Sequence, residues 1–365
     1  MKMHIKGACI TLMMLGACGP TNPFDVDEDG EAVEEPTEEE TPPVTGIYGD
    51  SPPPGTPEPT PTSGVVRSEI NDGEGSGVAS GFQYNAGADT FFVDNLGFDG
   101  QNTYTRDDQV PTLQDGPNGT YALYENEETV IDELNGQPIT QFTHKALYGV
   151  SPNTNAQGEP TVSFAIVRTG AYIEYGFGGF VYQRSTGANL PSVADLPATD
   201  TTPRGQARYS GDYAGLRDFG GRSGLEYVTG DMQVDVDFND TNANYAVKGN
   251  ITNRRIYDTA NNDVTFPYLD ALGTVYENTY TVMPTVRFTL TENGNLDVAG
   301  EATGNLQSII TNGDGANVAL EQGNYYALIG GNTGREMVGI VVLESDDPRV
   351  EGTQVRETGG FILVR

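Results

Sequence analysis

Few side chains in this 365-residue chain could act as nucleophiles, bases or soft metal ligands, because it has only two cysteines and two histidines. Cys9, Cys18 and His4 lie within the first eighteen residues, so His144 in QFTHKALYG is the only histidine beyond them. No G-x-S-x-G is present to supply a serine nucleophile, and a lone histidine on an alternating strand is typical of packing rather than of a base. We therefore expect no catalytic, cofactor-binding or metal-binding residue.

Cys18 has a sequence context that indicates chemical modification. The preceding residues carry Lys2 and Lys6, then an apolar run from Ala8 to Leu15, then Gly16 and Ala17. That order is the layout of a secretory signal, and its apolar run is too short to span a bilayer. Small residues directly before a cysteine resemble the bacterial lipobox. We therefore predict a signal peptide over residues 1–17, and lipid modification of Cys18 by diacylglycerol and a fatty acyl chain such as palmitate.

The next stretch, residues 18–65, is rich in proline, threonine and acid. Between Gly19 and Gly64 it has twelve acidic residues and no lysine or arginine. Such a composition cannot bury a core, and its charges repel one another while its prolines stiffen it. We expect a disordered tether that holds the rest of the protein away from the membrane.

Charge limits the partners of the whole chain, whose formal net charge is −33. A field of this sign repels nucleic acid and anionic headgroups, so membrane attachment has to come from the lipid. Against this background, arginines concentrate between Arg204 and Arg255. Guanidinium groups bind carboxylates and phosphates in bidentate fashion, which suggests an anion-recognising or partner-binding patch. Its predicted members are Arg217, Arg222, Arg254 and Arg255.

The alternative for these arginines is a set of ion pairs within the chain. If Arg254 and Arg255 instead form an exposed patch, replacing both with alanine should weaken partner capture and leave stability nearly unchanged. Other motifs have simpler interpretations. Asp25 to Glu31 has part of a calcium-loop pattern, but Pro36 stands where a bidentate glutamate is needed. The runs beginning at Asn71 and Asn312 are expected to be turns.

The elements that must position these residues are strands. In MQVDVDF, Met232, Val234 and Val236 alternate with polar residues, as in a strand with one wet face. VRFTL and LDVAG around Asn293-Gly294 predict a hairpin. NYYALIGG, REMVGIVVLES and GGFILVR predict successive strands with glycines where a closing sheet bends. The chain is therefore predicted to be all-β, and its spread of 47 glycines favours a barrel.

Proline-rich residues 191–204 separate a β-rich N-terminal domain, 66–190, from residues 205–365. The first domain holds an aromatic and glycine-rich run with Tyr172, Tyr175, Phe177, Phe180 and Tyr182. These rings are expected to pack in the sheet, and the alternative is that they line a ligand groove.

Residues 205–365 resemble the C-terminal barrel of the transferrin-binding protein B and factor H-binding protein group of surface lipoproteins. The resemblance rests on QARYSGDYAG, GDMQVDVDFND, VKGNITN and above all GNYYALIGGNTGREMVGIVVLES. Gly330, Gly331, Gly334, Glu336 and Gly339 form its glycine-rich turn, and Glu357, Gly359, Gly360 and Phe361 nearly repeat the pattern. It implies an antiparallel eight-stranded-type barrel.

The same resemblance implies an outer-membrane lipoprotein, on the periplasmic or the cell-surface side, whose loops bind a partner. Residues 66–185 do not match the loops with which that group grips transferrin or factor H, so those ligands do not carry over. We expect a non-enzymatic protein that captures an unidentified solute or protein partner. The alternatives are a structural envelope lipoprotein without a small ligand and a hydrolase that uses two of the many carboxylates.

The anchor prediction can be tested by replacing Cys18 with alanine. The variant should lose its acyl groups and leave the membrane fraction, because the acidic surface offers no second attachment. Fractionation of cells by ultracentrifugation, with a salt wash, measures this. A variant that still pellets with salt-washed membranes would contradict the anchor.

Overall fold

The computed structural model describes residues 51–69, 80–94, 103–110, 112–116, 119–126, 129–131, 135–140, 143–170, 178–199, 202–241, 246–289 and 296–365. Cys18, the Asp25 to Glu31 run, Asn71 to Gly77 and the Asn293-Gly294 pair lie outside the described residues. In the described part, no helix is long and apolar enough to cross a bilayer.

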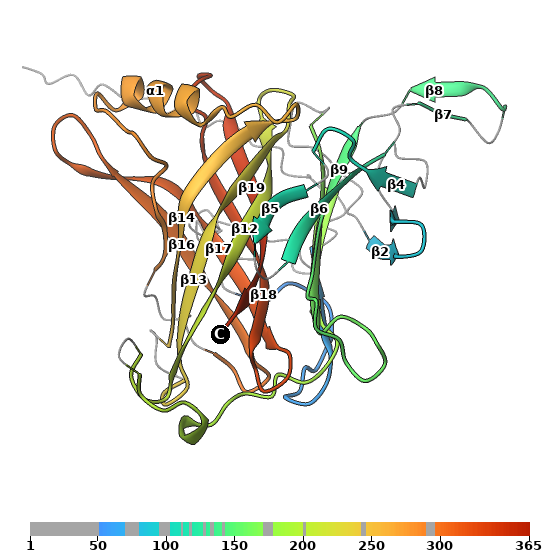
Figure 1. Ribbon diagram of the computed structural model, residues 1–365. Coiled ribbons are helices and arrows are strands. Elements are labelled where there is room, and N and C mark those ends of the chain that lie inside the picture. The colour runs from blue at the N-terminus through green and yellow to red at the C-terminus, as the bar shows by residue number, and fades with distance from the viewer. Residues whose placement is uncertain are drawn as a thin grey trace, which may run out of the picture. The chain divides into compact units, whose positions relative to one another are not determined.

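The C-terminal half is a closed antiparallel barrel of eight strands in chain order (Figure 1). This confirms the predicted all-β class and the predicted barrel. The strands are β12 Gln206–Gly220, β13 Glu226–Asp237, β14 Val247–Asp258, β15 Val286–Phe288, β16 Glu301–Thr311, β17 Asn317–Gly330, β18 Glu336–Asp346 and β19 Gln354–Val364.

Successive side chains along these strands point alternately into the barrel interior and towards its outer wall, as the period-two pattern requires. Met232, Val234 and Val236 of β13 are buried in the interior cluster with Tyr213 and Phe361. One expected strand is wrong. LDVAG forms a turn ending at Gly300, whose φ is 80°, and it is β16, beginning at Glu301, that pairs with β15.

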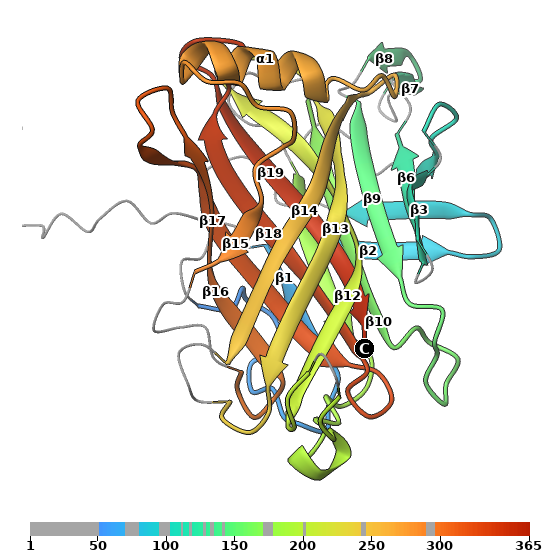
Figure 2. The same cartoon turned by 60° about the vertical axis from the view of Figure 1, so that its left-hand side comes forward.

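The N-terminal half is an antiparallel sheet that lies along one side of the barrel (Figures 1 and 2). Its order is β1-β11-β10-β9-β6-β4-β3-β2, with β5 also paired to β6. Its strands are β1 Val65–Ser68, β2 Ser80–Asn85, β3 Thr90–Asp94, β4 Thr103–Arg106, β5 Thr112–Gly116, β6 Gly119–Glu125, β9 His144–Val150, β10 Val162–Thr169 and β11 Gly178–Arg184. The strands β7 Thr129–Ile131 and β8 Pro138–Thr140 pair separately.

The sheet packs on an apolar face of the outer barrel wall. Leu216, Leu328, Ile340 and Ile362 point out of the barrel and are buried against the sheet cluster that contains Phe164. Such burial contributes roughly 25 cal/mol for each Å² of apolar surface removed from water.

Two glycines let the Phe164 ring lie flat against backbone. A Cβ on Gly360 of β19 would lie 2.2 Å from the ring, and one on Gly149 of β9 would lie 2.1 Å from it. Tyr121 of β6 also reaches the barrel seam. Its hydroxyl donates to the Asp212 carbonyl oxygen at 2.7 Å and accepts from the Ile362 N–H at 2.9 Å.

Charged side chains fix the register of this packing. Arg67 of β1 makes a bidentate pair with Glu301 of β16, with Nε–Oε1 and Nη2–Oε2 distances of 2.8 and 2.6 Å. Glu336 of β18 is buried and accepts hydrogen bonds from Ser151, Thr161 and Asn153. A carboxylate buried in this way needs such donors to replace water.

Residues 191–204 carry a short 3-10 helix, η1 Val193–Asp195, between the sheet and the barrel. The described residues, 51–365 with their gaps, group as one compact unit. Independent folding of the barrel stays a prediction.

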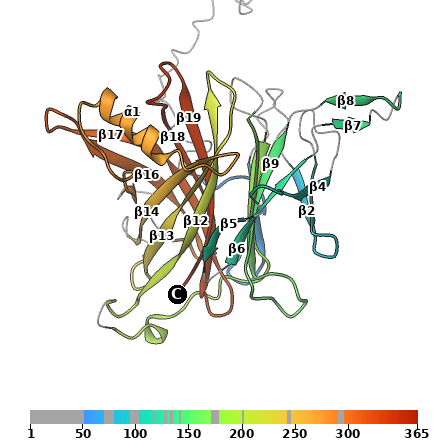
Figure 3. The same cartoon turned by 45° about the horizontal axis from the view of Figure 1, so that its top comes forward.

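A helix that the sequence did not predict, α1 Thr265–Val275, lies across one end of the barrel (Figures 1 and 3). We call this end the α1 end and the opposite one the Arg365 end. The turn from Thr60 to Ser63 lies at the Arg365 end, where Arg184 donates to the carbonyl oxygens of Thr60 and Ala299. Before this turn, residues 54–56 run antiparallel to β1, and the Ser68 N–H donates to the Pro54 carbonyl oxygen at 2.9 Å. Residues 54–64 therefore pack on the folded part instead of belonging to the tether expected over residues 18–65.

We expect residues 205–365 alone to give a β-type circular dichroism spectrum, because a closed barrel pairs its own edges. The fragment should nevertheless self-associate, because Leu328, Ile340 and Ile362 lose the sheet that covers them. Analytical ultracentrifugation of this fragment and of residues 51–365 compares their self-association. A random-coil spectrum would show that the barrel needs the sheet to fold.

Candidate functional site

A bulge in β14 decides which way the two neighbouring arginines of TNRRI point. Thr229 of β13 pairs with Arg255, but Asp231 pairs with Thr252, so Gly230 faces two residues instead of one. Asn253 has a φ of 53° at this point. A bulge of this kind shifts the inside-outside alternation by one position. Arg254 therefore points into the barrel and Arg255 points out.

Arg254 is a fully buried cation held by two carboxylates. Its side chain is 0% exposed, and its Nη2 lies 2.5 Å from Glu321 Oε2. Its Nη1 lies 3.4 Å from Glu357 Oε2, and Nη2 also donates to the Pro284 carbonyl oxygen at 3.1 Å. Ser308 donates to Glu321 as well, at 2.5 Å. The guanidinium thus links three barrel strands to the segment that follows α1.

Burial and mutual attraction act in opposite directions on the pKa values of Arg254 and Glu321. Burial by itself would raise the pKa of Glu321, but the Arg254 charge and the Ser308 hydroxyl lower it. Burial would likewise lower the Arg254 pKa, and the charges of Glu321 and Glu357 raise it instead. Both groups are therefore charged inside the barrel, where neither could stay ionised alone.

The network continues toward α1. Arg217 of β12 pairs with Glu226 at 2.9 Å and approaches Glu357 at 3.5 Å. Arg349 makes a second pair with Glu226 at 2.7 Å. The guanidinium carbons of Arg217 and Arg349 lie 5.0 and 5.3 Å from the ring centre of Tyr268, a residue of α1. Cation–π contacts of this geometry add to the apolar contacts that hold the helix.

α1 covers a gap in the barrel wall. β15 has three residues and pairs with β14 through only Asn250 and Ile251, so the ends of β14 and β16 nearest α1 have no strand between them. Asn278 and Tyr280 close the gap by donating to the Thr311 carbonyl oxygen at 2.6 and 2.8 Å. The apolar side chains beneath are Ile256, Tyr268, Leu269, Leu272, Met283, Ile310 and Leu320.

The outer face of this cover exposes apolar side chains. Phe266, Val275 and Val282 are 63, 56 and 72% exposed. Val275 stands at the end of α1, whereas Phe266 and Val282 lie close enough to line one pocket, and apolar residues exposed together in this way are typical of interaction surfaces. A pocket of about 210 Å³ opens beside two of them and is lined by Asn253, Arg254, Arg255, Asp263, Thr265, Phe266, Thr281, Val282 and Met283.

The structure does not bring the four predicted arginines onto one exposed patch. Arg217 and Arg254 are buried and paired, which matches the alternative of internal ion pairs. Arg222 lies 3.4 Å from the Phe219 ring centre and pairs with Asp347. Arg255 is 62% exposed and pairs with Asp263. Replacing Arg254 and Arg255 together would therefore remove a core ion pair as well as a surface charge, and we now expect the double variant to lose stability.

The structure also shows where other residues that the sequence singled out are located. His144 is buried at the start of β9, where its backbone N–H donates to the side-chain oxygen of Asn126. Phe180 and Tyr182 pack in the cluster between sheet and barrel, as sheet packing predicted, whereas Tyr172, Tyr175 and Phe177 lie outside the described residues. Asn312 to Asn317 is the predicted turn, between β16 and β17.

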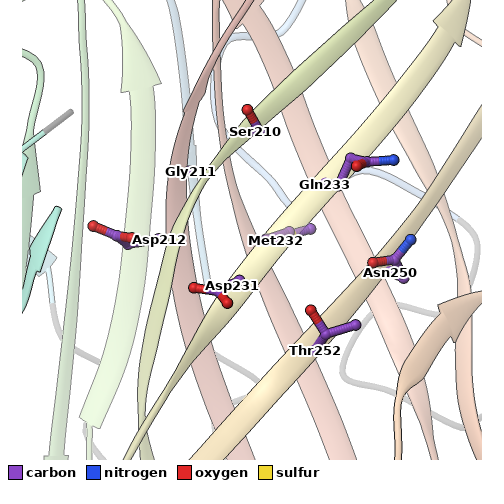
Figure 4. A pocket seen from close by; sticks show the side chains of 8 residues that line it. All are labelled: Ser210, Gly211, Asp212, Asp231, Met232, Gln233, Asn250 and Thr252. Carbon is purple, nitrogen blue, oxygen red and sulfur yellow. The ribbon is translucent and has the colours of Figure 1, made fainter. Parts of the chain in front are cut away.

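A second pocket, of about 320 Å³, opens on the outer barrel wall (Figure 4). Two carboxylates, those of Asp212 and Asp231, face each other across β12 and β13. Burial, together with the Asp231 charge, raises the pKa of Asp212. Asp231 is exposed and accepts from Asn253 at 2.6 Å. Within the described residues, no group of three or more acidic, histidine or cysteine side chains could hold a metal ion.

The residues that sequence reasoning missed are Phe266 and Val282. A signal for α1 was present, because Pro267 is tolerated in the first turn of a helix and Tyr268, Leu269 and Leu272 have helical spacing. No comparable signal marks Val282, whose exposure depends on how the segment after α1 crosses the barrel.

Comparison with known proteins finds no matching family model and no matching curated protein. Solved structures that match include transferrin-binding protein B structures. A double mutant of the Haemophilus parasuis protein is 12% identical over 83% of this chain and 52% of its own, with a TM-score of 0.31. Intact Ap-TbpB, with both lobes, is 15% identical over 66% of this chain, with a TM-score of 0.28. The chain spans 52% and 38% of their lengths, and the likeness concerns the fold alone.

We expect Arg254→Ala to lower the free energy of unfolding by about 3 to 5 kcal/mol, because it leaves buried carboxylates without their cation. Arg255→Ala is the matched control. Its exposed pair should contribute at most about 1 kcal/mol. Urea denaturation of both variants measures the difference, and equal losses would show that Arg254 does not hold the barrel interior.

Proposed function

We propose that this protein is a lipid-anchored, non-enzymatic binding protein of the outer membrane that presents the α1 end of its barrel to a protein partner. The anchor comes from the sequence around Cys18, since no described residue bears on it. The surface role rests on the acidic, proline-rich stretch between Gly19 and Gly64, which is the kind of segment that holds a domain away from a membrane.

One observation carries the proposal. At the α1 end of the barrel (Figures 1 and 2), Phe266 and Val282 are 63 and 72% exposed and line one pocket. Phe266 and Val282 are the side chains that a partner would cover.

The two alternatives have less support. A carboxylate-dependent hydrolase needs paired carboxylates that flank one bond, with the acid held at a raised pKa. Asp212 and Asp231 are neighbours, but they lie on the open outer wall and Asp231 is exposed. A purely structural lipoprotein would have no need of large apolar side chains exposed around one pocket.

The test uses single cysteines, because the unlipidated chain that begins at residue 19 has no other thiol. A bulky maleimide–polyethylene glycol is attached at Thr274→Cys on α1, or at Asp240→Cys in the loop between β13 and β14. Both positions are exposed. The unlabelled and labelled proteins are then used to capture partners from the native envelope.

We expect a protein partner to be captured by the unlabelled chain, lost when position 274 carries the polymer, and retained when position 240 carries it. Labelling that blocks capture equally at both positions would place the partner elsewhere. Failure of the unlabelled chain to capture any protein would favour the structural alternative.

A further inference from the structure

The pocket beside α1 combines an apolar rim with one exposed cation. Phe266 and Val282 stand at its rim, 63 and 72% exposed, and Met283 is buried at 5%. Arg255 projects beside them with 62% of its side chain exposed. The combination is unusual for this chain, because its net charge is −33 and its buried arginines are paired internally.

The pocket is built into the fold. The short β15 leaves the ends of β14 and β16 unbridged, and α1 with residues 276–285 covers the gap but leaves the pocket beside Phe266 and Val282. Asp263 holds the start of α1 by accepting from the Thr265 N–H at 2.9 Å, and Thr265 accepts from the Ile256 N–H at 2.9 Å. The Arg254 hydrogen bond to the Pro284 carbonyl oxygen fixes the other side. The walls are therefore held by contacts to the barrel.

Arg255 has capacity for another acceptor. Its Nη1 donates to Asp263 Oδ2 at 3.1 Å. A guanidinium has five N–H donors in a planar fork, which suits a second carboxylate beside the first. An incoming carboxylate could therefore bind without displacing Asp263.

The size of the pocket argues for a side chain rather than a free small molecule. Its volume of about 210 Å³ is below the roughly 300 to 1,000 Å³ typical of small-molecule sites. An apolar anchor placed in a pocket of a partner, with a charge at the rim, is the usual anatomy of a protein interface. An anionic membrane surface is disfavoured by the net charge of the protein.

We propose that this pocket binds one apolar side chain of a partner protein, and that a neighbouring carboxylate of the same partner segment pairs with Arg255. Phe266 and Val282 make the apolar contacts, and Arg255 selects the acidic neighbour. The inference rests on the proposed binding function and names the chemistry that the partner must carry.

The probe is a phage-displayed library of random 12-residue peptides, selected on the unlipidated chain that begins at residue 19. Enriched peptides should share an aromatic or branched aliphatic residue within three positions of an aspartate or glutamate. Their affinity should fall at least about tenfold on Phe266→Asp and on Arg255→Glu. Thermal melting of each variant checks that these exposed positions leave the fold intact.

Arg208→Glu is the matched control, because Arg208 is also an exposed arginine paired with one aspartate, Asp235, but lies on β12 away from the pocket. It should change affinity less than about twofold, as expected of a charge outside the interface. Replacing the acidic residue of the peptide with lysine should restore binding to Arg255→Glu. That restoration is the signature of direct charge pairing.

Three results would overturn the inference: no enriched motif, a motif without an acid, or affinities that Phe266→Asp and Arg255→Glu leave unchanged. Sedimentation of the free chain tests whether a second copy of the protein occupies the pocket. A dimer that Phe266→Asp dissociates would show that a second copy fills the pocket instead. The polymer-block experiment is independent, because capture blocked at position 274 but insensitive to Arg255→Glu would keep the binding function and reject this pocket.

Discussion

A guanidinium inside the barrel is the constraint on which the α1 end depends. Arg254 is buried and paired with Glu321 and Glu357, and its removal would leave these buried carboxylates short of a cation. Because the same guanidinium donates to the Pro284 carbonyl oxygen, the charge balance of the interior also positions the segment that follows α1. The interior at this end is too polar to be closed by apolar packing alone. The helix therefore presents both an apolar underside and Tyr268, whose ring lies beside two guanidinium groups.

The sheet and the barrel are joined by a mixture of apolar packing and buried charge. Phe164 can approach only because Gly360 and Gly149 have no side chains. Glu336, which stands in the glycine-rich turn motif of the sequence, is one of the barrel groups that accept hydrogen bonds from the sheet. Apolar contact supplies most of the burial, and the charged pairs select one register among many.

The two ends of the barrel therefore differ in their contacts and in the side chains that they expose. The Arg365 end holds the turn from Thr60 to Ser63, which is fixed by the contacts of Arg184, while the α1 end carries exposed apolar residues and an outward arginine (Figures 1 and 2). A bulge of one residue at Asn253 separates the two roles of the neighbouring arginines. One of them stabilises the interior and the other faces solvent at the rim of the pocket.

The amino-acid sequence by itself determined the β class, the barrel and the positions of β17, β18 and β19, because alternation and glycine spacing are local properties of a strand. It also determined the charge of the chain and the lipobox-like context of Cys18. Only the tertiary structure decided that Arg254 is internal and Arg255 external, since a bulge depends on how β13 and β14 pair. It likewise decided that LDVAG is a turn, and that Phe266 and Val282 are exposed. Whether an apolar side chain is buried or exposed depends on packing between segments that are distant in sequence. A local sequence pattern does not determine it.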